Sequence, residues 1–146
     1  MDQAVFRPML YGLLMWAVSI YAFRRGGWEE RLAATGMIIA SYLSALVVSP
    51  YESMYRHVEV PMAIVDFCLF VLLWCIGLWS NRFWPLWVAA IQGVTVLGHA
   101  APLMPNMSPY ASDRAVAMWS WPVWIILAFA VRAHHRENSA GDQSSR

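Results

Sequence analysis

Hydrophobic residues are gathered along the chain into long blocks that are separated by short polar islands. A helix on the surface of a soluble protein repeats its apolar residues with a period of 3.6, whereas each block here is apolar nearly all the way round. An α-helix needs about 17 to 25 such residues to cross the hydrocarbon core of a bilayer. The pattern predicts an all-α polytopic transmembrane bundle with about five short spans, at residues 6–23, 32–48, 61–79, 85–101 and 115–131.

The ends of these blocks carry recognisable helix signals. The first block stops at the polar sequence Arg24–Gly27, and Pro61 and Pro85 open the third and fourth blocks. Proline is tolerated in the first turn of a helix, where its missing N–H has no helical partner in any case. The uninterrupted apolar run of the first block, residues 9–23, has only fifteen residues, so the alternative is a segment 9–23 that lies at the membrane surface, with four spans in all.

Composition agrees with a membrane location and argues against nucleic acid as a partner. Hydrophobic residues make up 60% of the 146 positions and charged residues only 13%, against roughly 25% charged residues in soluble domains. The net charge of +1 offers no basic stripe for nucleic acid. The polar residues 132–146 lack the apolar content for a core and predict a disordered tail.

The arginines predict an orientation, because positively charged residues concentrate in cytoplasmic loops. With five spans, seven arginines share one side and three share the other. The larger group is Arg24, Arg25, Arg31, Arg82, Arg132, Arg136 and Arg146, and the smaller is Arg7, Arg56 and Arg114. The amino terminus is therefore expected outside and the carboxyl terminus in the cytoplasm.

Two further patterns concern packing and the membrane boundary. Gly36, Ala40 and Ser44 are spaced four apart and align on one face of the second span, which favours close helix packing. Aromatic residues flank the segment Ser80–Arg82, and Trp28 lies in the first cytoplasmic connection. Amphipathic indoles favour the headgroup zone, so these aromatics predict a belt on the inner side.

The third and fourth spans bring ionisable residues to one depth. Asp66 lies five residues past Pro61, roughly 8 Å along the descending third helix. His99 lies fourteen residues past Pro85, about 21 Å along the ascending fourth helix, and Gln92 precedes it by two turns on the same face. Ionisable side chains in spans usually face a bundle interior, so His99 or a loop arginine is the expected partner of Asp66.

These residues admit three interpretations. Asp66, Gln92 and His99 could form a structural clasp between helices, or they could line a polar path for protons or ions. His57, Glu59, Asp66 and His99 could supply two nitrogen and two oxygen ligands to a metal ion, because carboxylates and histidines gather in the outer connections. No cofactor is predicted, and familiar catalytic motifs such as H-E-x-x-H and G-x-S-x-G are absent from the sequence.

The segment from Arg82 to Trp124 carries a resemblance. It contains RFWPLW, then Gln92 and His99, and then the beginning of a tryptophan-rich fifth helix. In these features it is similar to small uncharacterised bacterial inner-membrane proteins. The resemblance covers under half of the chain and implies a membrane location, and it transfers no functional residue.

Three functions follow as hypotheses. The first is a non-enzymatic accessory or scaffold component of a membrane complex, whose partners are the bilayer and other membrane helices, in a homo- or hetero-oligomer. The second is a small transporter or proton-path subunit that uses Asp66, Gln92 and His99. The third is an intramembrane enzyme or metal protein that uses the outer cluster of histidines and carboxylates.

Overall fold

Five α-helices and no strands are formed by the residues that the computed structural model describes, which are 3–47, 60–100 and 109–144. Side chains are described for residues 9–47, 60–100 and 121–140. The helices are α1 (Gln3–Arg25), α2 (Trp28–Val47), α3 (Val60–Trp79), α4 (Trp84–Gly98) and α5 (Pro109–Ser144). For these described residues, the prediction of an all-helical fold with five helices is confirmed.

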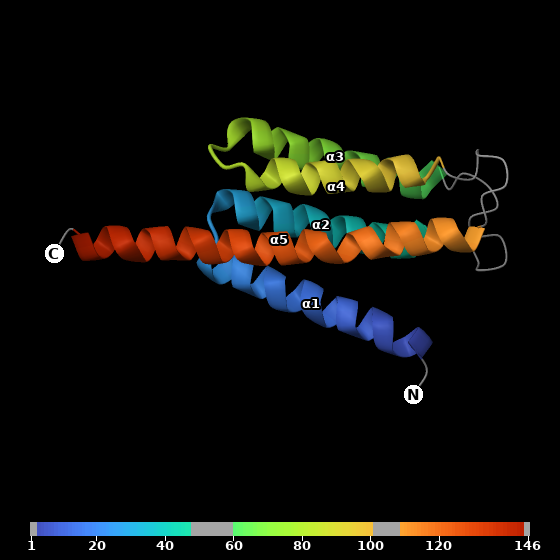
Figure 1. Cartoon of the computed structure of the whole chain (residues 1–146), viewed down its shortest axis with the longest axis horizontal. Coiled ribbons are helices and arrows are strands. Elements are labelled where there is room, and N and C mark those ends of the chain that lie inside the picture. The colour runs from blue at the N-terminus through green and yellow to red at the C-terminus, as the bar shows by residue number, and fades with distance from the viewer. Residues whose placement is uncertain (1–2, 48–59, 101–108, 145–146) are drawn as a thin grey trace.

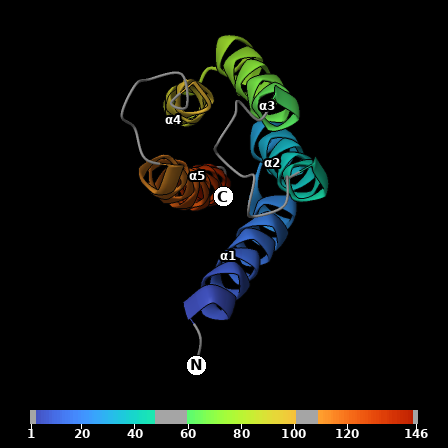
Figure 2. The same ribbon diagram turned by 90° about the vertical axis from the view of Figure 1, so that its right-hand side faces the viewer.

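Successive helices run in alternating directions, so the α1–α2 and α3–α4 turns lie at the same end of the molecule (Figure 1). We call this the turn end, and α5 extends past it toward the carboxyl terminus. Viewed along the helices, α2, α3, α4 and α5 form a four-helix arrangement, and α1 lies outside it against α2 and α5 (Figure 2). The α3–α4 pair forms the most extensive contact between helices.

Large apolar side chains fill the interior, with Trp124, Leu73 and Ile76 among those that are fully buried. A polar contact joins three helices beside this core. The indole Nε1–H of Trp124 donates to the hydroxyl of Tyr11 at 3.1 Å, and that hydroxyl lies 3.4 Å from Oγ of Ser41. A buried tryptophan normally finds such a hydrogen-bond acceptor, and here the contact fixes α1 against α5 and α2.

The apolar character of the described helices is unevenly distributed. Two of them, α2 and α3, are long and apolar enough to cross a membrane, and α4 is a shorter apolar helix. The more apolar of the two, α3, has only 17% of its apolar 18-residue stretch buried within the chain. Exposed large apolar side chains occur on every helix and include Leu13, Ile39, Phe67, Trp87 and Phe129.

The helix boundaries differ from the predicted spans chiefly in α5. The prediction ended the fifth span at residue 131 and made residues 132–146 a disordered tail, whereas α5 continues to Ser144. Polar contacts to the turn end account for the difference. Nε2 of His135 lies 3.0 Å from Arg25, and Glu137 pairs with Arg82 at 2.6 Å. A segment too polar to form a core can thus extend a helix that a core already holds.

The small-residue face of α2 packs against α3 of the same chain. A side chain placed on Gly36 would meet the side chains of Leu72 and Leu69. Ala40, one turn further along, is buried, and Ser44 is partly exposed. Gly36 and Ala40 therefore serve the packing of helices within this chain.

Candidate functional site

Asp66, Gln92 and His99 lie together between α3 and α4, near the end opposite the turns. Nε2 of His99 is 2.6 Å from Oδ2 of Asp66, and the amide nitrogen of Gln92 donates to Oδ1 of Asp66 at 2.9 Å. Gln92 also donates to the backbone carbonyl of Asp66 at 3.4 Å. Both carboxylate oxygens of Asp66 therefore have a partner, and His99 is one of the two partners that the sequence analysis expected.

The antiparallel α3–α4 hairpin positions these three side chains. Gln92 and His99 are seven residues apart, so they project from the same face of α4, with His99 capping its end. Two glycines allow the helices to approach closely. A Cβ on Gly77 would lie 2.6 Å from Cδ2 of Leu86, and a Cβ on Gly93 would lie 3.3 Å from the ring of Phe70.

The site is mostly shielded from solvent. The side chain of His99 is 5% exposed and that of Asp66 is 16% exposed. Hydrogen bonds gain electrostatic strength in such surroundings, and a group left without a partner there is costly. The arrangement can act as a clasp that fixes the register of α3 on α4, or as a carboxylate–imidazole pair that exchanges a proton.

The predicted metal ligands are only partly described. His57 and Glu59 lie outside the described residues, so the structure places only Asp66 and His99 of that set. Among the described residues, no group of three or more His, Cys, Asp or Glu side chains could hold a metal ion. The Asp66–His99 pair by itself supplies two ligands, which is fewer than a structural metal site uses.

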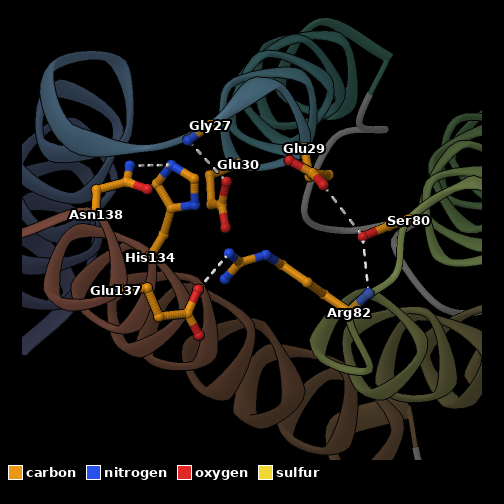
Figure 3. Close-up of polar contacts among 8 residues, drawn as sticks. All are labelled: Gly27, Glu29, Glu30, Ser80, Arg82, His134, Glu137 and Asn138. Atoms are coloured by element: carbon orange, nitrogen blue, oxygen red, sulfur yellow. Dashed lines mark hydrogen bonds and ion pairs between the residues drawn. The ribbon is translucent and has the colours of Figure 1, made fainter. Parts of the chain in front are cut away.

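A second polar cluster lies at the turn end (Figure 3) and was missed by the sequence analysis, which placed the carboxylates and histidines mainly in the outer connections. Ser80 donates to Oε1 of Glu29 at 3.3 Å, and the backbone N–H of Arg82 donates to Oγ of Ser80 at 3.1 Å. Arg82 then reaches across to Glu137 of α5. The cluster joins both turns to the extended part of α5.

Glu30 is the most deeply buried member of this cluster, with an exposed fraction of 0%. Its Oε2 accepts the backbone N–H of Gly27 at 2.9 Å. Gly27 directly precedes α2 and Glu30 is its third residue, so Glu30 supplies the reaching-back half of a capping box. The sequence signal for this helix cap is a glycine that is followed three residues later by a glutamate, at the start of an apolar block.

Exposed aromatic side chains lie at the turn end, which is where the sequence analysis predicted an aromatic belt. Trp79 and Phe83 are each 79% exposed, and Trp28 and Trp87 are also exposed. They come from the start of α2, the end of α3 and the start of α4, all of which lie at this end. The arrangement places apolar rings beside the arginines of the two turns.

Comparisons with protein-family models, curated proteins and solved structures found no match to the chain.

Proposed function

We propose that the chain is a small integral protein of a bacterial inner membrane, with five spans, that acts as a non-enzymatic accessory or scaffold subunit of a membrane complex. The exposure of α3 is the observation that carries the membrane assignment. The apolar core helix of a soluble protein is mostly buried, whereas only 17% of the apolar stretch of α3 is buried. Removing such a surface from water requires lipid or other helices.

The scaffold role is supported by the outer face of α1. Large apolar side chains recur on it every three or four residues, and the chain itself leaves them exposed: Met9, Leu13, Trp16, Ile20 and Phe23. A Cβ added to Gly12, beside this stripe, would have nothing within 4 Å. A partner helix could pack closely at such a position, because small residues let membrane helices approach.

Affinity purification in mild detergent tests the scaffold role. We expect the tagged chain to copurify with a membrane partner in fixed stoichiometry, and Leu13→Ala with Trp16→Ala to weaken that association. Phe129→Ala serves as the control, because Phe129 is similarly exposed but lies on α5. Recovery of the chain only as a monomer, together with normal growth of cells that lack it, would contradict the role.

A proton-path subunit is the second candidate, and the 2.6 Å contact between Asp66 and His99 favours it. Buried carboxylate–imidazole pairs in membrane proteins are suited to proton relays. Proton flux into proteoliposomes, followed with an internal pH-sensitive dye, provides the test. The path predicts that Asp66→Asn and His99→Ala each lower the flux, whereas Glu137→Gln, on the surface of α5, leaves it unchanged. Equal fluxes in all four proteins would refute the proton path.

A further inference from the structure

The exposed face of α5 changes from apolar to basic as the helix reaches the turn end. Ile125 and Phe129 are exposed on the apolar part. Arg132 and Arg136 are exposed further along the helix, three and seven residues past Phe129. The spacing of four, three and four residues places all four side chains on one face of the helix. This face therefore presents apolar groups on one side of a boundary and two guanidinium groups on the other.

Contacts with the two turns place this boundary beside the exposed aromatic rings of the turn end. Nη1 of Arg25, at the end of α1, lies 3.0 Å from Nε2 of His135. Glu137 pairs with Arg82, which lies between α3 and α4. The α5 residues 135–137 are thus level with the turns, and the helix continues past them (Figure 1). The basic part of the face begins where the bundle ends.

The guanidinium groups at this place have no carboxylate partner. Arg25 lies beside His135, and Arg132 and Arg136 are three residues before and directly after that histidine. Among the residues whose side chains the structure describes, the only arginine–carboxylate pair within 4.0 Å is that of Arg82. A guanidinium group has five N–H donors, so Arg25 keeps donors beyond the one directed at His135. The three arginines can therefore bind an anion.

The apolar and basic parts of the face together fit one kind of ligand. Arginine binds phosphate oxygens through paired hydrogen bonds. A soluble anion would use the arginines but would leave Ile125 and Phe129 in contact with water, which is unfavourable. A phospholipid with an anionic headgroup matches both parts, because its phosphate and its acyl chains lie on opposite sides of the membrane boundary. Basic residues on the cytoplasmic side of membrane proteins bind such headgroups.

We propose that the turn end binds an anionic phospholipid against α5, beside the end of α1. Arg132 and Arg136 hold the headgroup phosphate, Arg25 adds a third guanidinium group, and Phe129 and Ile125 contact an acyl chain. This site goes beyond the scaffold function and rests on the membrane location that is proposed with it. Arg132 and Arg136 each raise the affinity about fivefold, the usual gain from one basic residue near an anionic membrane surface.

Native mass spectrometry of the full chain in detergent tests the site, because it resolves single bound lipids. We expect the wild type to bind phosphatidylglycerol more tightly than phosphatidylcholine with the same acyl chains. Arg132→Gln and Arg136→Gln should each lower the affinity for phosphatidylglycerol about fivefold. Arg31→Gln is the matched control, because it removes the same charge from an exposed position on α2, and it should leave the affinity nearly unchanged. Equal affinities for the two lipids, or equal losses in all three variants, would overturn the proposal.

Two measurements on the wild type require no variant to fold. Inorganic phosphate added in excess should not displace phosphatidylglycerol, and displacement would assign the arginines to a soluble anion instead. Raising ammonium acetate from about 0.1 M to 1 M shortens the Debye length from about 10 Å to 3 Å. The affinity for phosphatidylglycerol should then fall toward that for phosphatidylcholine. A preference that does not change with salt would also contradict the site.

Flotation of reconstituted vesicles separates failure of this site from failure of the membrane location. We expect the chain to float with vesicles of phosphatidylcholine alone, because crossing a bilayer requires no anionic lipid. A chain that floats with these vesicles but does not prefer phosphatidylglycerol keeps its membrane location and loses the lipid site. A chain that does not float contradicts the membrane location, and the lipid site fails with it.

Discussion

At the scale of single residues, the turn between α1 and α2 is closely packed around Gly26. Gly26 is buried, and a Cβ on it would lie 2.6 Å from the backbone carbonyl oxygen of Ala22 and 2.8 Å from Cβ of Glu30. Neither atom is the end of a flexible side chain, so the contact could be relieved only by moving the backbone. The N–H of Gly26 also donates to the same carbonyl of Ala22 at 2.9 Å and closes the end of α1.

Gly26→Ala is therefore expected to destabilise the fold by about 1 to 3 kcal/mol, the usual cost of forcing extra atoms into a packed site. Reversible unfolding of the detergent-solubilised chain provides the measurement. Gly12→Ala is the matched control, because a Cβ there meets nothing within 4 Å. Alanine in a helix interior is favoured over glycine by roughly 0.5 to 1 kcal/mol, so this control should be neutral or stabilising. Equal losses in both variants would contradict the role of Gly26.

Sequence reasoning reached one of the two polar sites and missed the other. Asp66 and His99 were brought to one level by counting residues from Pro61 and Pro85, because the rise per residue in a helix is fixed. Glu30 and His134 are about a hundred residues apart and come from α2 and the extended part of α5. No periodicity links them. His134 belonged to a segment that was predicted to be disordered, so its place beside Glu30 depended on contacts that only the fold supplies.

At the scale of helices, the α3–α4 hairpin was the most predictable element and α5 the least. Pro61 and Pro85 are each the second residue of their helix, within one residue of the predicted starts. Both lie where proline is tolerated and its restriction of φ suits a helix start. For α5, the local composition predicted the end of the helix at residue 131, whereas cross-contacts such as Arg82–Glu137 accompany a helix that continues to Ser144.

The Asp66–His99 contact should contribute measurably to the stability of that hairpin. In a double-mutant cycle with Asp66→Ala and His99→Ala, we expect a coupling free energy of about 0.6 to 2 kcal/mol, the range found for polar contacts between membrane helices. Unfolding in bicelles, followed by a steric-trap assay, would measure it.

The control cycle pairs Asp66→Ala with His134→Ala, because Asp66 lies near the start of α3 and His134 lies at the turn end. Its two effects should add to within about 0.5 kcal/mol, because distant sites without shared partners are independent. Coupling no larger in the first cycle than in the control would show that the pair does not act as a clasp.

At the scale of the whole molecule, the proposed membrane orientation rests on the alternation of five helices and on the distribution of the arginines. Arg24, Arg25 and Arg82 lie in or beside the two turns, at the same end as the exposed rings of Trp79 and Phe83. Positively charged residues concentrate on the cytoplasmic side of membrane proteins, whereas aromatic residues occur at both membrane boundaries, so the arginines carry the proposed orientation. The amino terminus then belongs outside, provided that α1 crosses the bilayer as the other helices are proposed to do.

Cysteine accessibility can decide whether α1 crosses. In a background with Cys68→Ala and Cys75→Ala, single cysteines would replace Gln3, Asn81 and Ala100, which lie at the start of α1, in the α3–α4 turn and after α4. A membrane-impermeant maleimide applied to right-side-out vesicles should label Ala100→Cys but should label Asn81→Cys only after permeabilisation. If α1 spans the bilayer, Gln3→Cys behaves like Ala100→Cys, because one crossing separates it from the turn end. If α1 lies at the inner surface, Gln3→Cys behaves like Asn81→Cys, and the five-span arrangement is wrong.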